Sequence, residues 1–322
     1  MATGIVSIAA HLEGMHRLAI ALYGLNLVFF AALWALTLAR VVFYRARVVA
    51  DLLHHGRSVG FFTMVAASSV LGSQSLVVGG LHGVALGLWG LTIVLWVVLT
   101  YTIITILTVK REKPSLADGI HGGWLLIVVA SHAVAVLGAQ LAPAMGAGAA
   151  EALLLSLTMW LGGSMLYIWI ISLIFYRYTF FTLSPSDLAP PYWINMGAAA
   201  IATLGGASLV AAAPSSPVLM EVLPFVRGMT LLWWATATWW IPMLVILGAW
   251  RHVARRFPLR YDPAYWGAVF PLGMYTVCTI RLSQAVDAPY LRVIPRGFVF
   301  VAIAAWGVAM LGMLSSLLRR RA

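Results

Sequence analysis

The sequence predicts an all-α integral membrane protein with ten transmembrane helices in a single domain, residues 1–322. Only 9% of the residues are charged and 62% are hydrophobic, whereas a soluble protein carries about 25% charged residues. Uncharged runs long enough to cross a bilayer recur along the whole chain. Every second run is rich in small residues, which indicates an internal repeat of one helix pair.

Short gaps with glycine, proline and charged residues separate ten apolar segments. The first segment is shorter than the roughly 20 residues that cross a membrane. No basic leader or cleavage site marks this segment as a signal peptide. The predicted segments are 1–12, 17–44, 59–79, 83–109, 119–142, 151–178, 191–213, 222–250, 263–286 and 296–318.

The segments alternate in composition. The even-numbered ones are rich in Leu, Val, Ile and Trp, so we expect them to face lipid. Four odd-numbered ones begin with Phe61, Trp124, Trp193 or Trp266 and continue with Ala, Gly and Ser; the short first segment matches the small-residue half only. Small residues allow close helix packing. Their restriction to odd segments favours an inner ring of helices around a common axis, wrapped by an outer ring.

The basic residues predict the orientation. The ends reached after the even segments hold 15 of the 20 Lys and Arg, including Arg320 and Arg321. By the positive-inside rule both termini are cytoplasmic and the protein lies in the inner (plasma) membrane. The net charge of +11 is spread over these loops, so the expected partner is the lipid bilayer and not nucleic acid.

Carboxylates are missing from the predicted spans. All nine Asp and Glu lie at helix ends or in loops, which argues against a cation channel and against a carboxylate proton relay. No metal-ligand spacing, cofactor motif or nucleophile motif is present, so we expect no metal, no cofactor and no enzyme activity. The single cysteine, Cys278, excludes an intrachain disulfide.

Phe270 and Pro271 form the most distinctive motif. Proline kinks a helix and frees a carbonyl that then needs another partner or a water-lined cavity. A phenylalanine at such a kink, on a helix of small residues, could project into a lumen and block it. The alternative is that Phe270 is an ordinary packing residue.

Polar and small side chains on the odd segments are candidates for the pore wall, because hydroxyl and amide groups can solvate an anion without fixed charge. The possible pore-lining residues are Thr3, Ser68, Ser131, His132, Asn195, Gly197 and Thr276. Arg227 and Arg281 could raise the local anion concentration. Helix packing is the alternative for His132, and contact with lipid headgroups is the alternative for both arginines.

Three stretches carry a family resemblance: MATGIVSIAA at the start, PPYWINMGAAAI at 190–201 and DPAYWGAVFPLGMYT at 262–276. They resemble the tellurite-resistance/dicarboxylate transporter family, which includes bacterial malate transporters, fungal sulfite efflux pumps and plant guard-cell slow anion channels. The resemblance implies five helical hairpins in a pseudo-five-fold arrangement around a central pore, a homotrimer, and a phenylalanine gate that matches Phe270. The sequence departs from the family at its short first segment.

The sequence therefore predicts an anion channel or uniporter for small inorganic anions or C4-dicarboxylates such as malate. The alternative within transport is a proton-coupled dicarboxylate transporter or a tellurite or sulfite exporter, with His132 as the coupling candidate. A membrane scaffold or enzyme is a third hypothesis, and the missing catalytic cluster disfavours it.

Overall fold

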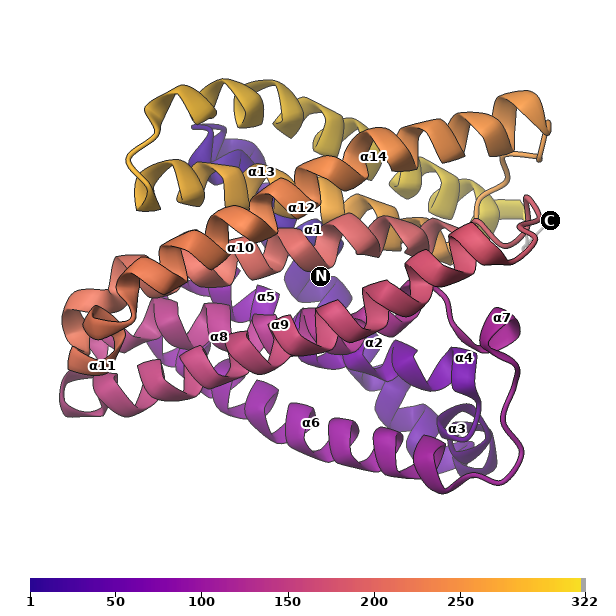
Figure 1. Ribbon diagram of the computed structural model, residues 1–322, viewed down its shortest axis with the longest axis horizontal. Helices are drawn as coiled ribbons and strands as arrows, with labels where there is room; N and C mark the ends of the chain where they lie inside the picture. The colour runs from indigo at the N-terminus through magenta and orange to yellow at the C-terminus, as the bar shows by residue number, and fades with distance from the viewer. Residues whose placement is uncertain (320–322) are drawn as a thin grey trace.

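The computed structural model of the protein describes residues 1–319, and over that range it is helical without strands. Each predicted segment coincides with a helix, and the long helices run roughly along one axis (Figure 1). These helices are α1 (Ala2–Leu12), α2 (His16–Phe43), α5 (Phe62–Val77), α6 (His82–Val109), α8 (Leu126–Leu141), α9 (Ala149–Phe180), α10 (Ile194–Ala212), α12 (Leu223–Ala249), α13 (Trp266–Ala285) and α14 (Val293–Arg319). Arg320 and Arg321, grouped above with the cytoplasmic charges, lie outside the described residues.

Four shorter helices lie in the connections: α3 (Arg45–Leu52), α4 (His55–Ser58), α7 (Leu116–Gly119) and α11 (Pro217–Glu221). The sequence did not predict them. Single 3₁₀ turns lead into α5, α8, α10 and α13, at Val59–Phe61, Gly122–Leu125, Pro190–Trp193 and Pro263–Tyr265. The opening aromatics of the sequence repeat lie in these turns or directly after them, so the repeat marks the starts of four helices.

Eight helices within residues 1–319 are long and apolar enough to cross a membrane, against the ten predicted. The helix α1 has only 11 residues. The helix α13 has 20 residues but is not among the eight. Length and composition therefore support eight of the ten predicted spans.

Five helices are buried, and they are the odd-numbered segments of the sequence. Side chains are buried along α1, α5, α8, α10 and α13, whereas α2, α6, α12 and α14 expose most of theirs. In the 18-residue window that qualifies Gly122–Ala144 as a membrane span, 94% of the residues are buried, compared with 17% in the corresponding window of His16–Phe43. The buried helices contact one another in a closed cycle, from α1 to α5, α8, α10, α13 and back to α1.

Hydrogen bonds fasten each exposed helix to a buried one. The indole N–H of Trp160 on α9 donates to the Ala202 carbonyl of α10 (2.8 Å), and Trp306 on α14 donates to the Thr3 hydroxyl of α1 (3.1 Å). Side chains of the other exposed helices also donate to buried helices. These hydrogen bonds run from Trp89 to the Val134 carbonyl, from Trp96 to the Ser131 hydroxyl, from Trp234 to the Thr279 hydroxyl and from Asn26 to Oε1 of Gln74. In lipid a buried indole N–H needs such a partner, so the tryptophans link neighbouring hairpins.

Glycines permit two close helix approaches. A Cβ at Gly205 on α10 would lie 2.9 Å from Cδ1 of Trp160, and one at Gly197 would lie 2.6 Å from Cγ of Pro271. Real Cβ atoms essentially never come within 3.0 Å of a neighbour. The small residues of α10 therefore allow α9 and α13 to pack against it at short range.

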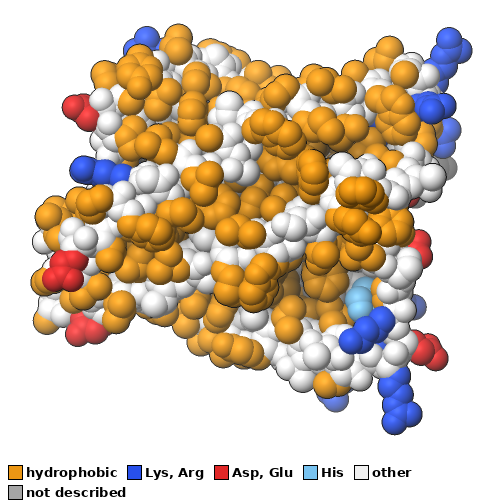
Figure 2. Space-filling view, in the orientation of Figure 1, with side chains coloured by type: hydrophobic (Ala, Val, Ile, Leu, Met, Phe, Trp, Pro, Cys, Tyr) orange, Lys and Arg blue, Asp and Glu red, His pale blue; other side chains and the backbone are white. Residues whose placement is uncertain are grey.

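Charged side chains gather at the two ends of the molecule, and an apolar belt separates them (Figure 2). At one end Arg177 is buried, donates to the carbonyl of Ala117 (2.6 Å) and lies 3.6 Å from Asp187. The Asp187 carboxylate also accepts a hydrogen bond from the Ser184 backbone N–H, which lowers the pKa of that carboxyl below its ordinary value. These contacts join the 116–119 and 184–188 connections to α9.

Candidate functional site

The five buried helices enclose a small cavity where they meet. About 20 Å³ is open to the centres of water molecules, which is room for about one water. All five helices contribute to its wall, which consists of Ile5, Ile8, Ser69, Val70, Ser73, Ala133, Val136, Gln140, Ile201, Leu204, Met274 and Val277.

The lining follows one pattern. Each buried helix provides two residues three positions apart: Ile5 and Ile8, Val70 and Ser73, Ala133 and Val136, Ile201 and Leu204, and Met274 and Val277. Residues with this spacing lie on one face of a helix. The cavity therefore runs along equivalent faces of five helices that occur at similar intervals in the sequence.

Only three polar side chains line the cavity, and they come from two adjacent helices. Ser69 of α5 donates its hydroxyl hydrogen to the Ala133 carbonyl of α8 (2.5 Å). Gln140 of α8 has a buried Oε1 without a hydrogen-bond partner among the described residues. None of the nine carboxylates lines the cavity. The wall can therefore offer hydroxyl and amide groups to an anion and no negative charge.

Phe270 lies on the cavity-facing side of α13. It precedes Met274 by four residues and Val277 by seven, a spacing that places all three on one helix face. Its side chain is 1% exposed. On the other helices, the residue four positions before the first member of the lining pair is Ala66 on α5, Val129 on α8 and Gly197 on α10. Phe270 is the one aromatic in this comparison, and it stands one turn from the cavity.

Pro271 contacts the neighbouring buried helix. Its ring faces Gly197 of α10, where even a methyl group would collide with it. The helix α13 continues through this proline from Trp266 to Ala285. Pro271 and Gly197 thus set the distance between α10 and α13 next to Phe270.

The predicted pore-lining residues have other contacts in this structure, and none of the seven is among the side chains that line the cavity. Thr3 and Ser131 accept hydrogen bonds from Trp306 and Trp96 of exposed helices. His132 contacts Ser164 of α9 (3.4 Å), and Asn195 donates to the Tyr178 hydroxyl of α9 (3.3 Å).

The remaining three predicted residues have local contacts. Ser68 and Thr276 donate to carbonyls of their own helices, at 2.9 and 3.1 Å, and Gly197 faces Pro271. The sequence identified the polar residues of the correct helices. It did not identify the faces: Ser69, Ser73 and Gln140 also stand out in the sequence as polar residues of these segments, but they were not among the seven predicted pore-lining residues. Of the three, only Ser73 belongs to a pair with the recurring spacing of three residues.

The two candidate arginines differ in position. Arg227 is exposed near the start of α12. Arg281 is half-buried near the end of α13, four residues after Val277, and donates to Oε1 of Gln284 (3.2 Å). Arg281 therefore lies on the cavity-facing side of its helix, and Arg227 lies on the outer layer of the molecule.

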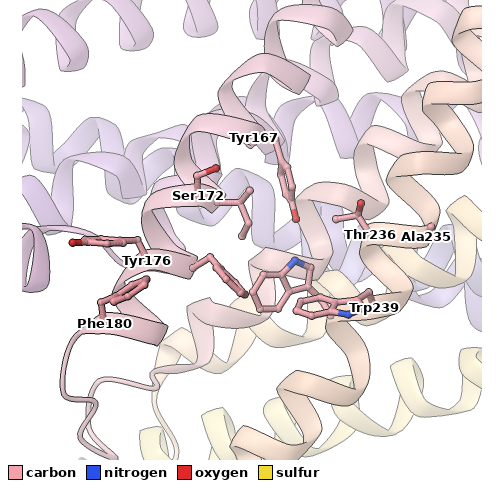
Figure 3. Close-up of a pocket in the computed structure, with 10 residues that line it drawn as sticks. Tyr167, Ser172, Tyr176, Phe180, Ala235, Thr236 and Trp239 are labelled. Carbon is pink, nitrogen blue, oxygen red and sulfur yellow. The ribbon is translucent and has the colours of Figure 1, made fainter.

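A larger hollow of about 680 Å³ lies on the outside of the bundle, between α9 and α12. Aromatic side chains including Tyr167, Tyr176, Phe180 and Trp239 border it (Figure 3). No charged side chain lines it, and the two helices that form it belong to the exposed layer. This groove faces away from the cavity and offers no site for an anion.

Buried helices around a carboxylate-free cavity, surrounded by apolar helices, define a multi-pass membrane protein. The family model described as a voltage-dependent anion channel (SLAC1) matches residues 1–314. The chain belongs to this family, which is a family of anion channels and transporters.

Individual relatives agree with this assignment. An uncharacterized membrane protein of Mycobacterium tuberculosis (strain H37Rv) is 41% identical over 47% of this chain and 77% of its own length. An uncharacterized transporter of Methanocaldococcus jannaschii is 23% identical over 97% of this chain and 89% of its own length. A protein of Trichophyton rubrum named sulfite efflux pump SSU1 is 23% identical over 95% and 85% of the two chains.

Proposed function

We propose that the protein is a passive pathway for small anions along the axis of the five buried helices, and that Phe270 closes it. The observation that carries this proposal is the cavity, which all five helices line and no carboxylate approaches. Phe270 continues the line of Met274 and Val277, so its ring would occlude the axis one turn from the cavity.

The proposed architecture is ten membrane segments arranged as five hairpins with pseudo-five-fold symmetry. The closed cycle of buried helices, the paired lining residues and the hydrogen bonds from each exposed helix all support it. In this arrangement α13 needs little hydropathy, because other helices shield it from lipid.

Because the cavity is small, small inorganic anions need the least opening of the helices. A volume that admits about one water is too small for a C4-dicarboxylate without further opening of the helices. The relatives named sulfite efflux pumps make sulfite a reasonable candidate substrate. Malate and tellurite remain predictions from the resemblance, as does the homotrimer, which native mass spectrometry in detergent would test.

The proposed gate is tested by replacing Phe270 with alanine. We expect Phe270→Ala to raise anion conductance in a planar bilayer by about tenfold, which corresponds to about 1.4 kcal/mol less barrier. The control is Phe298→Ala, because Phe298 is a half-buried phenylalanine on the outer helix α14, with its ring 4.9 Å from that of Tyr275. Unchanged currents through a well-expressed Phe270→Ala protein would remove Phe270 as the gate.

A coupled transporter is the second candidate, and the name of the sulfite efflux relatives favours it. His132 is fully buried within α8 and contacts Ser164, so it is the candidate for proton coupling. Sulfite flux into proteoliposomes is measured with and without a pH gradient. For a passive pathway, we expect the flux at a given electrochemical gradient of the anion to be the same with and without the pH gradient. For coupled transport, we expect the proton gradient to drive accumulation of sulfite inside the proteoliposomes.

A further inference from the structure

The short helix α3 leaves an apolar face uncovered at the end of the molecule where α2 and α6 end (Figure 1). Four exposed apolar residues of α3 and the position directly after it follow the spacing of one helix face, and they are Ala46, Val49, Ala50 and Leu53. Val49 is 53% exposed and Leu53 is 43% exposed. Asp51 lies on the opposite face and is half-buried. The apolar face of α3 is therefore turned away from the protein.

Two arginines flank this apolar face. Because an α-helix turns by about 100° per residue, Arg45 and Arg47 lie on either side of it. Both are exposed, and neither forms an ion pair with a carboxylate among residues 1–319. Asp51, the one carboxylate of α3, pairs instead with Arg40 and with Arg57. Arg45 and Arg47 therefore carry positive charge that no described carboxylate neutralises.

The connection after α6 adds positive charge beside α3. The ammonium group of Lys110 donates a hydrogen bond to the Leu53 carbonyl (3.1 Å), which joins the two segments. Residues 40–57 and 110–113 together hold seven Lys and Arg but only two Asp and Glu. We call α3, Leu53 and residues 110–113 the α3 surface. This surface therefore combines an exposed apolar face with a marked excess of positive charge.

The position of the apolar face favours a membrane as its partner. It begins where the exposed apolar surface of α2 ends, at Phe43, which is 76% exposed. An apolar face flanked by arginines is typical of a helix that lies in the membrane interface, where the arginines reach lipid headgroups. The short helix α11 also exposes apolar residues, Val218 and Met220, but it carries Glu221 and no Lys or Arg. The basic flanks therefore distinguish α3 from α11.

We propose that the α3 surface binds the headgroups of anionic phospholipids. Val49 and Leu53 enter the boundary between headgroups and acyl chains, and Arg45 and Arg47 donate hydrogen bonds to lipid phosphate oxygens. The excess positive charge favours anionic over zwitterionic lipids. Because α3 leads through α4 into α5, a bound lipid holds the start of a helix that lines the cavity. This lipid site does not depend on the proposed anion pathway.

The test measures the binding of phosphatidylglycerol and phosphatidylcholine to the purified protein by native mass spectrometry. We expect the wild-type protein to prefer phosphatidylglycerol, and an Arg45→Gln/Arg47→Gln variant to bind it about tenfold more weakly. The control is Arg17→Gln/Arg227→Gln, which removes two exposed charges at the starts of α2 and α12 and should keep wild-type affinity. Equal affinity for phosphatidylglycerol in the wild-type and Arg45→Gln/Arg47→Gln proteins would overturn the proposal.

A second variant tests the apolar face and keeps both arginines. Val49→Glu places a carboxylate on that face, so we expect it to weaken phosphatidylglycerol binding by a similar factor. Because Val49 is exposed, the melting temperature without added lipid should stay unchanged. Wild-type lipid binding in Val49→Glu would show that α3 stays out of the membrane interface, against the proposal. A changed oligomeric state in both variants, with unchanged lipid binding, would instead assign the α3 surface to contacts between copies of the chain.

Discussion

Trp160 illustrates how single side chains hold the two layers of helices together. It is fully buried, although it belongs to an exposed helix, and its indole N–H reaches the Ala202 carbonyl of α10. Gly205 lies beside its ring and leaves the room that it needs. Trp160 thus links α9 to α10 in two ways, by packing its ring against Gly205 and by donating a hydrogen bond to a backbone carbonyl.

Replacing Trp160 with phenylalanine should remove the hydrogen bond and keep most of the aromatic surface. We expect a loss of about 1 kcal/mol of stability, the usual scale of an interhelical hydrogen bond in a membrane. The measurement is the melting temperature in detergent. Trp239→Phe is the control, because Trp239 is 54% exposed on α12, and an equal loss in both variants would contradict the assigned role.

The pair formed by α10 and α13 is the element that most directly positions Phe270. The two helices meet where Gly197 faces Pro271, one residue after Phe270. Since α13 is also in contact with α1 and α14, displacement of α10 cannot be absorbed by moving α13 freely. Their spacing therefore decides where the Phe270 ring lies relative to the cavity.

Gly197→Ala should separate these two helices. The added Cβ would lie 2.6 Å from the Pro271 ring, and overpacking of this kind costs about 1–3 kcal/mol. Gly228→Ala is the matched control, because nothing lies within 4 Å of a Cβ at that position on α12. A melting temperature as high in Gly197→Ala as in the control would show that the contact is not constraining.

At the scale of the whole molecule, the distribution of charge sets the proposed orientation in the membrane. The apolar belt of Figure 2 separates two charged ends, and 15 of the 20 basic residues belong to one of them by sequence. By the positive-inside rule we propose that this end faces the cytoplasm. In that orientation the end of α13 that carries Arg281 lies on the opposite side.

Cysteine labelling tests this orientation, because Cys278 is the one cysteine and is buried. In a Cys278→Ser background, a membrane-impermeant maleimide applied to intact cells should label Tyr290→Cys and leave Glu112→Cys unlabelled. Both positions are exposed at helix connections. After permeabilisation both should react, and the reverse pattern in intact cells would invert the proposed topology.

The sequence alone determined the helices and their division into two classes. Bulky apolar residues on α6 and small residues on α10 differ in composition, and composition decides whether a helix can pack closely in an inner ring. The Phe270–Pro271 motif also stood out by composition, since the equivalent position on α10 is Gly197. The number of spans was less well predicted, because α1 and α13 lack the length or hydropathy that marks a span.

Only the tertiary structure decided which face of each buried helix lines the cavity. A helix buried on all sides has no alternation of polar and apolar residues to reveal its orientation. Polar residues such as Ser131 and Asn195 therefore looked like pore wall, although Ser131 accepts a hydrogen bond from Trp96 and Asn195 donates one to Tyr178, both on exposed helices. Ser73 and Gln140 face the cavity instead, because the registration of five helices against one another places them there.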